Sequence, residues 1–183
     1  MKYIINIPSK NANRYFSDLL ISLESHGIVN YDFKYWNPFA LLKNKKMVDV
    51  IILHFPESLW RNKNYIKRIF SLSLFWINFI LAKIVGYKII FFVHNVLPHN
   101  SYMHLKWEAF NRQILLLLSH YVVGIAKITK GEITKQLRIN ADKINFRYIS
   151  HGISREVNRN GCLNNFPKES KKFHFLIPAI REH

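Results

Sequence analysis

The chain of 183 residues is 49% hydrophobic and carries 27 Lys and Arg against 11 Asp and Glu, which gives a formal net charge of +16. This length fits one domain, because domains usually span roughly 100–200 residues. The single cysteine, Cys162, excludes an intrachain disulfide and fits a reducing compartment, and the basic excess favours an anionic partner such as nucleic acid or a membrane surface.

The N-terminal stretch predicts a strand, a loop and a helix. Residues 1–7 form an apolar run that is too short for the core of a signal peptide and lacks a cleavage site, so we interpret it as a strand. A helix is expected to begin near Asn13 and to end at Gly27. Its inward residues recur at helical spacing: Phe16, Leu19, Leu20 and Leu23. No glycine-rich phosphate loop follows the strand, so no dinucleotide cofactor is expected.

A buried strand that ends in a histidine is expected in the next part of the chain. Residues 28–36 predict a weak strand, Asn37-Pro38 begins a short connecting element, and residues 49–55 predict a buried strand that ends at His54. Glu57 follows Pro56 at this strand end. It has two interpretations, as a functional carboxylate or as a residue that caps the next helix N-terminus.

Residues 66–85 predict an unusually apolar helix. Its uncharged part, residues 69–82, is 14 residues long, shorter than the ~20 needed to span a bilayer, so we do not expect it to cross a membrane. Burial against the sheet is the favoured interpretation. The alternative places its outer face in the lipid interface, with basic residues beside it. The expected membrane-contact residues are Lys67, Arg68, Phe75, Trp76, Phe79 and Lys83.

The segment 89–100, IIFFVHNVLPHN, contains the main candidate site. Its run of β-branched and aromatic residues does not alternate with polar ones, which is typical of a strand buried on both faces in a parallel sheet. In such sheets ligands bind outside the carboxyl ends of the strands. We therefore expect the residues after the strand to meet a substrate: His94, Asn95, His99 and Asn100.

The rest of the chain continues the alternation of strands and helices. A helix is expected over residues 101–119, followed by a strand at 120–126, a helix at 129–137 and a strand at 144–150. The inward residues predicted for the first of these helices are Leu105, Ala109, Ile114, Leu117 and Leu118. This order predicts an α/β domain of the doubly wound, Rossmann-like kind, with a mostly parallel sheet, over residues 1–153. Residues 154–172 are polar and are interpreted as a linker, and residues 173–183 begin with a further strand.

Three short motifs, HFPE (54–57), FFVHNVLPH (91–99) and YISHG (148–152), occur in the same order as in a known family. The chain resembles the N-terminal half of a GT-B glycosyltransferase, and in particular those bacterial sugar transferases of polysaccharide assembly that carry W-T-x-H-N-x-x-P-H-E and I-P-H-G motifs. Asn100 stands where the family has an acidic residue. The resemblance covers roughly residues 1–180 and implies that the sequence ends as a second, donor-binding domain begins.

The resemblance implies an enzyme that transfers a sugar from a nucleotide-sugar to a lipid-linked or polysaccharide acceptor, in the cytoplasm at the inner face of the cytoplasmic membrane. It implies no cofactor, because the nucleotide-sugar is a co-substrate. That co-substrate is held mostly by the other domain, so the chain alone is expected to transfer no sugar. The expected catalytic residues are His94, as the base that activates the acceptor, and Glu57. The expected substrate-binding residues are His54, Asn95, His99, Asn100 and His151.

Two alternatives remain open at this stage. An unperturbed histidine has a pKa near neutrality, which suits a general base, but a histidine at a strand end, such as His94, can equally serve only to bind a backbone carbonyl. No metal site is expected, because the histidines lack the spacing and acidic partners of a ligand set. The chain as a whole can also be interpreted as a non-catalytic basic module that binds nucleic acid or anionic lipid.

Overall fold

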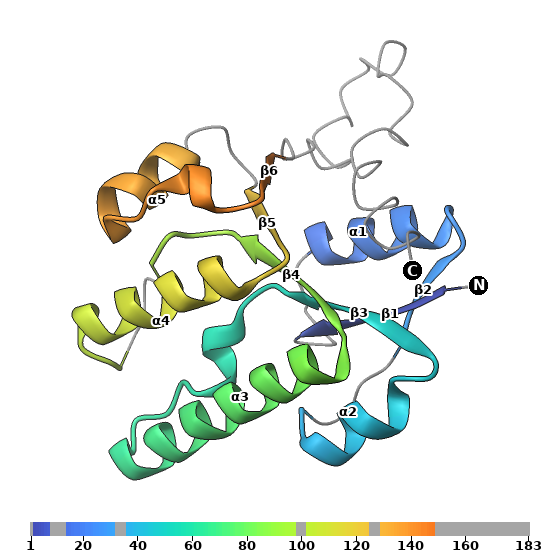
Figure 1. Cartoon of the computed structure of the whole chain (residues 1–183), viewed down its shortest axis with the longest axis horizontal. Helices are drawn as coiled ribbons and strands as arrows, with labels where there is room; N and C mark the ends of the chain where they lie inside the picture. The colour runs from blue at the N-terminus through green and yellow to red at the C-terminus, as the bar shows by residue number, and fades with distance from the viewer. Residues whose placement is uncertain (1, 8–13, 32–35, 98–101, 125–128, 149–183) are drawn as a thin grey trace.

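The computed structural model describes residues 2–7, 14–31, 36–97, 102–124 and 129–148, in which strands and helices alternate (Figure 1). Its elements are β1 (Lys2–Ile7), α1 (Arg14–Glu24), β2 (Ile28–Asn30), α2 (Pro38–Asn44), β3 (Val48–Leu53), η1 (Pro56–Leu59), α3 (Tyr65–Val85), β4 (Lys88–Val93), α4 (Leu105–Leu118), β5 (Tyr121–Gly124), α5 (Thr129–Leu137), η2 (Ala141–Lys143) and β6 (Phe146–Tyr148). The predicted α/β fold class is confirmed. The linker and further strand predicted within residues 149–183 lie outside the described residues.

All six strands are parallel and follow the order β2-β1-β3-β4-β5-β6. The first five strands have the flavodoxin-like order, one of the two common doubly wound arrangements. In this arrangement the connections leave β1 and β3 in opposite directions, so a crevice forms between their carboxyl ends, where such proteins bind ligands. The two strands are in register there, with Ile7 opposite Leu53.

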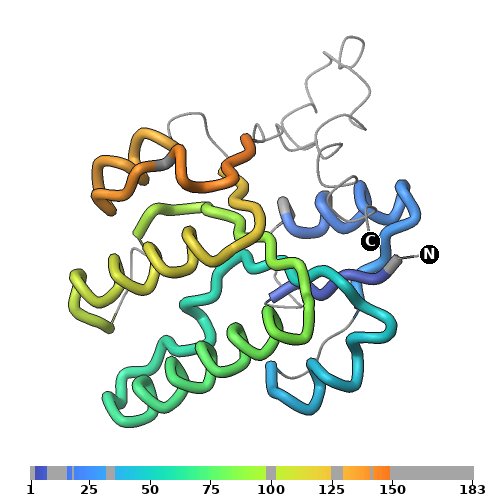
Figure 2. Tube along the Cα trace, in the orientation of Figure 1, coloured from blue at the N-terminus to red at the C-terminus, as the bar shows by residue number. Residues whose placement is uncertain are grey.

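The helices cover the two faces of the sheet unequally. Right-handed crossovers place α1 on one face and the helices that follow β2 on the other, and Figure 1 shows α1 across the sheet from α2 and α3. The α1 side holds a small apolar cluster that includes Leu19, Leu23 and Phe92. The opposite side holds a larger cluster with residues from α2, α3, α4 and α5. Figure 2 follows the same course of the chain as a tube.

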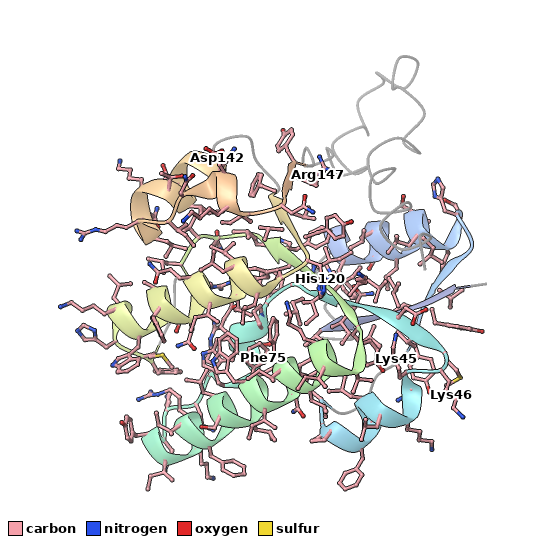
Figure 3. All side chains as sticks on the ribbon, viewed as in Figure 1. Lys45, Lys46, Phe75, His120, Asp142 and Arg147 are labelled. Atoms are coloured by element: carbon pink, nitrogen blue, oxygen red, sulfur yellow. The ribbon has the colours of Figure 1, made fainter. Side chains whose placement is uncertain are left out.

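Helix α3 has well-defined ends. The Asn64 side chain accepts a hydrogen bond from the Lys67 backbone N–H at 3.1 Å, and Gly86 ends the helix with φ +92°, a left-handed conformation that favours glycine. The side of α3 that faces the sheet is formed by Phe75, Asn78, Phe79 and Ala82, all buried. Figure 3 labels Phe75 in the interior of the molecule.

The alternative interpretation of α3, with its outer face in the lipid interface, named two wrong side chains. It placed Phe75 and Phe79 at that interface, but the structure buries both in the core, with 1% and 0% of their surfaces exposed, as the favoured interpretation predicted. Because nearly every position of α3 is apolar, the periodicity of the sequence does not distinguish its inner from its outer side. The other four predicted contact residues, Lys67, Arg68, Trp76 and Lys83, are described below with the outer face.

Helix α4 also turns a different side inward from the one predicted. Leu105, Leu117 and Leu118 were expected inside, but all three are exposed. The buried residues of α4 are instead Glu108, Asn111, Arg112, Leu115 and Leu116. Asn111 and Arg112 bond to partners on other elements, and these tertiary contacts decide which side of α4 faces the sheet.

Candidate functional site

Polar side chains gather where the central strands end. His54 directly follows β3 and His94 directly follows β4, as predicted from the apolar runs that precede them. The backbone N–H of His54 donates to the Ile7 carbonyl of β1 at 2.9 Å, so the residue is held at the edge of the sheet by the strand ladder. Because all strands are parallel, both histidines lie at the same edge, beside the crevice between β1 and β3.

Four side chains form a continuous row of hydrogen bonds across this edge, which we call the polar row. Asn6 of β1 donates from Nδ2 to Oδ1 of Asn30 at 2.8 Å. The Asn6 Oδ1 lies 3.1 Å from Nε2 of His54, and Nδ1 of His54 lies 3.4 Å from Nε2 of His94. The row thus joins the carboxyl ends of four neighbouring strands, β2, β1, β3 and β4.

The environment of His54 makes its ring neutral. Burial, and next the nearby His94 ring, lower the pKa of His54 from 6.5 to about 3. The ring lies 4.8 Å from that of Phe92 and 5.1 Å from that of Phe16, centroid to centroid, so aromatic carbon surrounds it. At pH 7 His54 therefore carries one ring proton and holds one nitrogen lone pair.

The polar row also fixes which nitrogen of each histidine carries the proton. Asn6 Oδ1 can only accept a hydrogen bond, so Nε2 of His54 donates to it. Nδ1 of His54 is then an acceptor, and Nε2 of His94 donates to it. This leaves Nδ1 of His94 as the ring nitrogen that holds a lone pair in the neutral form.

His94 is held in place by its neighbours but reaches the surface. Its ring stacks on that of Phe55, with centroids 4.3 Å apart and an interplanar angle of 19°. The residue is half-buried, whereas the following Asn95 is exposed. A ring with a fixed orientation, one assigned proton and access to solvent can accept a proton from a bound molecule.

The structure gives Glu57 a different role from the one predicted. Glu57 was expected as a catalytic carboxylate at the sheet edge, but only 7% of its surface is exposed. Its Oε2 accepts a hydrogen bond from Nη2 of Arg112 at 2.7 Å, and the guanidinium of Arg112 lies 5.3 Å from the centre of the Phe91 ring. We therefore assign Glu57 to a buried ion pair that joins η1 to α4, and no longer to acid–base chemistry.

The remaining predicted residues divide into two groups. His54, His94 and Asn95 lie at one edge of the sheet, and the structure brings the first two together. His99, Asn100 and His151 lie outside the described residues. In the described ranges no group of three or more His, Cys, Asp or Glu side chains is arranged to hold a metal ion.

Sequence reasoning missed four residues that organise the site. These are Asn6 and Asn30 in the polar row, Phe55 under His94, and Arg112 opposite Glu57. Asn6 alone gave a usable signal, because it is a polar residue inside the apolar run of β1 and is completely buried. A polar residue in a buried strand needs a hydrogen-bond partner, and so indicates that one is near.

Comparisons of this chain with protein-family models, with curated proteins and with solved structures found no match. The resemblance to the N-terminal half of a GT-B glycosyltransferase therefore stays a prediction that depends on the three short motifs.

Proposed function

We propose that the chain is the acceptor-side domain of a sugar transferase, in which His94 activates the acceptor. The acceptor hydroxyl attacks the anomeric carbon of a nucleotide-sugar, the bond from that carbon to the diphosphate breaks, and the hydroxyl proton passes to His94. The observation that carries the proposal is the polar row, because it holds one histidine at the crevice between β1 and β3 with an assigned proton.

Three members of the polar row, His94, His54 and Asn6, have a part in this proposal. Nδ1 of His94 takes the hydroxyl proton, and the imidazolium that forms still donates its Nε2 proton to His54. A neutral His54 is a suitable partner for that cation, because a second positive charge at this distance would oppose proton transfer. Asn6 holds the proton of His54 on Nε2, so the lone pair of Nδ1 faces His94.

The test is sugar transfer by the full gene product, measured as labelled sugar that passes from a panel of uridine and guanosine diphosphate sugars to lipid-linked and glycan acceptors. Replacing His94→Ala is expected to lower turnover by about 10²–10⁴-fold, the usual scale for loss of a general base. The matched control is His26→Ala at the end of α1, away from the polar row, which should leave turnover unchanged.

Two results would count against the proposal. Near-full turnover by His94→Ala would remove His94 from the role of base. Absence of transfer from every donor and acceptor by the wild type would remove the activity itself. We also expect residues 1–183 alone to bind none of the nucleotide-sugars tightly, and a dissociation constant in the low micromolar range by calorimetry would contradict this expectation.

A second candidate function is non-catalytic binding of single-stranded nucleic acid. It is favoured by exposed aromatic rings next to basic residues, such as Tyr65 beside Arg68, whose guanidinium lies 5.4 Å from the ring centre. This function predicts affinity for single-stranded DNA or RNA that falls steeply with salt and is insensitive to His94→Ala. Fluorescence anisotropy with a labelled oligonucleotide measures both.

A further inference from the structure

We propose that the outer surface of α3 and α4 is a docking surface for an anionic lipid bilayer, on which both helices lie parallel to the membrane plane. The inference concerns the side of α3 opposite to the one predicted from the sequence. It does not depend on the reaction proposed above, because it stands on exposure and charge at a different part of the molecule.

The surface consists of apolar side chains that no described element covers, and we call it the apolar face. On α3 the exposed fractions reach 76% for Ile66, 70% for Phe70 and 77% for Ile84. The full apolar face is Ile66, Ile69, Phe70, Leu74, Ile77, Ile80 and Ile84 of α3 with Leu105, Trp107, Phe110, Leu117 and Leu118 of α4. An exposed set of large apolar side chains of this kind is typical of an interaction site.

The two helices are joined side by side, so their outer sides form one surface. Trp76 of α3 donates from Nε1 to Oδ1 of Asn111 of α4 at 2.7 Å, and Lys83 donates to the Leu118 carbonyl at the other end. Both helices cover the same face of the sheet and follow neighbouring strands, so they run in the same direction (Figures 1 and 2). Their apolar residues therefore point away from the sheet together.

The exposed charges around the apolar face are basic. From Ser58 to Leu118 the only acidic residue is Glu108, which is buried with its neighbour Arg112, and there are seven further basic residues: Arg61, Lys63, Lys67, Arg68, Lys83, Lys88 and Lys106. Of these, Arg61, Lys63, Lys67 and Lys106 are exposed, and they lie just before α3 or in the first turns of α3 and α4. Basic residues beside an apolar surface are the combination that binds anionic lipid.

The same charge argues against a second copy of the chain as the occupant of this surface. Two such surfaces would bring two sets of basic residues together without acidic partners, and the resulting repulsion opposes association. Nucleic acid would meet the basic residues but would leave the aliphatic side chains, such as Ile77 and Ile84, exposed to water. A lipid interface satisfies both the apolar and the basic residues.

The contacts of α3 favour a helix in the membrane plane over one that crosses it. Among the described helices, α3 alone is long and apolar enough to span a bilayer by length and composition, and 22% of its most apolar window is buried. However, Phe75 and Phe79 pack in the core, and Asn78 donates from Nδ2 to the Trp36 carbonyl at 2.9 Å. A spanning helix would lose these contacts, whereas a helix at the interface keeps them.

Four other residues were predicted from sequence to contact a membrane, and three of them, Arg68, Trp76 and Lys83, are half-buried. Lys67 is exposed, as that role requires. Arg68 is half-buried and donates to the Asn62 carbonyl at 3.3 Å, and Trp76 and Lys83 are half-buried in contacts with α4. These residues thus fix α3 in place, and the apolar face itself makes the proposed lipid contact.

The experiment is flotation of the purified full chain with vesicles of phosphatidylcholine, alone or with about a third phosphatidylglycerol, at low and high salt. Binding to the anionic vesicles and its weakening at 0.5 M salt are expected, since charges at a surface are screened over about 10 Å at 0.1 M salt and about 3 Å at 1 M. The double variant Phe70→Ser/Ile77→Ser should lower the partition coefficient by at least about tenfold.

A charge variant tests the basic residues, and one matched control accompanies each of the two tests. Ile21→Ser removes an apolar residue that is 63% exposed on α1, across the sheet, and should leave partitioning unchanged. Lys63→Glu/Lys67→Glu should lower partitioning by more than about tenfold, since each basic residue near an anionic surface contributes roughly fivefold. Lys46→Glu/Lys135→Glu changes the net charge equally at exposed positions just after α2 and on α5, which contribute no residue to the apolar face, and should have a much smaller effect.

Several outcomes would overturn the proposal. If no vesicle binds at low salt, or if Ile21→Ser matters as much as Phe70→Ser/Ile77→Ser, the apolar face is not a lipid-docking surface. Concentration-dependent dimers in analytical ultracentrifugation that the Phe70→Ser/Ile77→Ser variant abolishes, without vesicle binding, would make a second copy the occupant. Circular dichroism of each variant shows that a loss of binding is not a loss of fold.

Discussion

Two buried polar clusters lie on opposite sides of β4, and they avoid the cost of burial in different ways. On the α1 side, His54 packs against Phe92 and remains neutral, with its pKa lowered to about 3. On the α4 side, Arg112 lies over Phe91 and forms an ion pair with Glu57, 2.7 Å away. A buried ionisable group is tolerated when it loses its charge or finds an opposite one.

The difference between the two clusters is also a difference in what each can do. The ion pair of Glu57 and Arg112 is buried and holds η1 against α4. The polar row contains two imidazoles in contact, and one of them reaches solvent. The polar row is therefore the cluster suited to proton transfer, whereas the ion pair supports the edge of the sheet.

Breaking the ion pair should have the largest effect on stability. Arg112→Met leaves the Glu57 carboxylate buried without its partner, and we expect the free energy of unfolding to fall by about 3–5 kcal/mol. Urea denaturation followed by circular dichroism measures this loss. The double variant Glu57→Leu/Arg112→Met removes both charges and should regain most of it. If Arg112→Met lowers the free energy of unfolding by less than about 1 kcal/mol, the buried position of Glu57 does not depend on Arg112.

The polar row should make stability depend on pH. In the unfolded chain His54 binds a proton near pH 6.5, but in the folded chain only near pH 3. Between these values the unfolded state binds more protons, so the free energy of unfolding falls as the pH falls, by at most about 1.4 kcal/mol per pH unit for this residue. Urea midpoints at pH 7, 5.5 and 4.5 should show this slope.

A variant pair isolates the contribution of His54. His54→Gln should remove its part of the slope, since glutamine has no proton to gain in this range. The same change at His104, which is exposed at the start of α4, should not. Equal slopes for His54→Gln and the wild type would mean that folding does not lower the pKa of His54.

The smallest expected effect comes from placing an acidic side chain beside His54, as Glu57 lies beside Arg112. Asn6→Asp places a carboxylate near Nε2 of His54, in the position of an acceptor 3.1 Å away. An opposite charge at this distance favours the protonated ring, so the pKa of His54 should rise by about one unit or more, equivalent to ~1.4 kcal/mol. Titration of the ring by nuclear magnetic resonance measures the pKa. Asn30→Asp, one residue further along the row, should raise it less.

The extent to which the sequence predicted the fold and the site differs from element to element. The inner side of α1 was predicted because Phe16, Leu19 and Leu23 alternate with polar residues at helical spacing, and all three are buried. The positions of His54 and His94 followed from the apolar runs before them, because parallel strands end at one edge.

What the sequence did not predict depends on contacts between distant elements. The inward side of α4 is decided by Arg112 and Asn111, whose partners Glu57 and Trp76 come from η1 and α3. No local pattern encodes these two pairs, because Trp76 and Asn111 are 35 residues apart and Glu57 and Arg112 are 55 residues apart. The polar row likewise joins Asn6 to His54, 48 residues later, and neither position alone indicates the other.

The place of β1 in the sheet has a consequence for synthesis of the protein. β1 is made first but lies between β2 and β3, and Tyr3 pairs with both Val29 and Val48. One edge of this apolar strand therefore stays unpaired until β3 is available, however quickly β2 forms. An open strand edge pairs readily with other chains, so the nascent protein is most exposed to aggregation over this interval, and products that end before Val48 should need a chaperone to remain soluble.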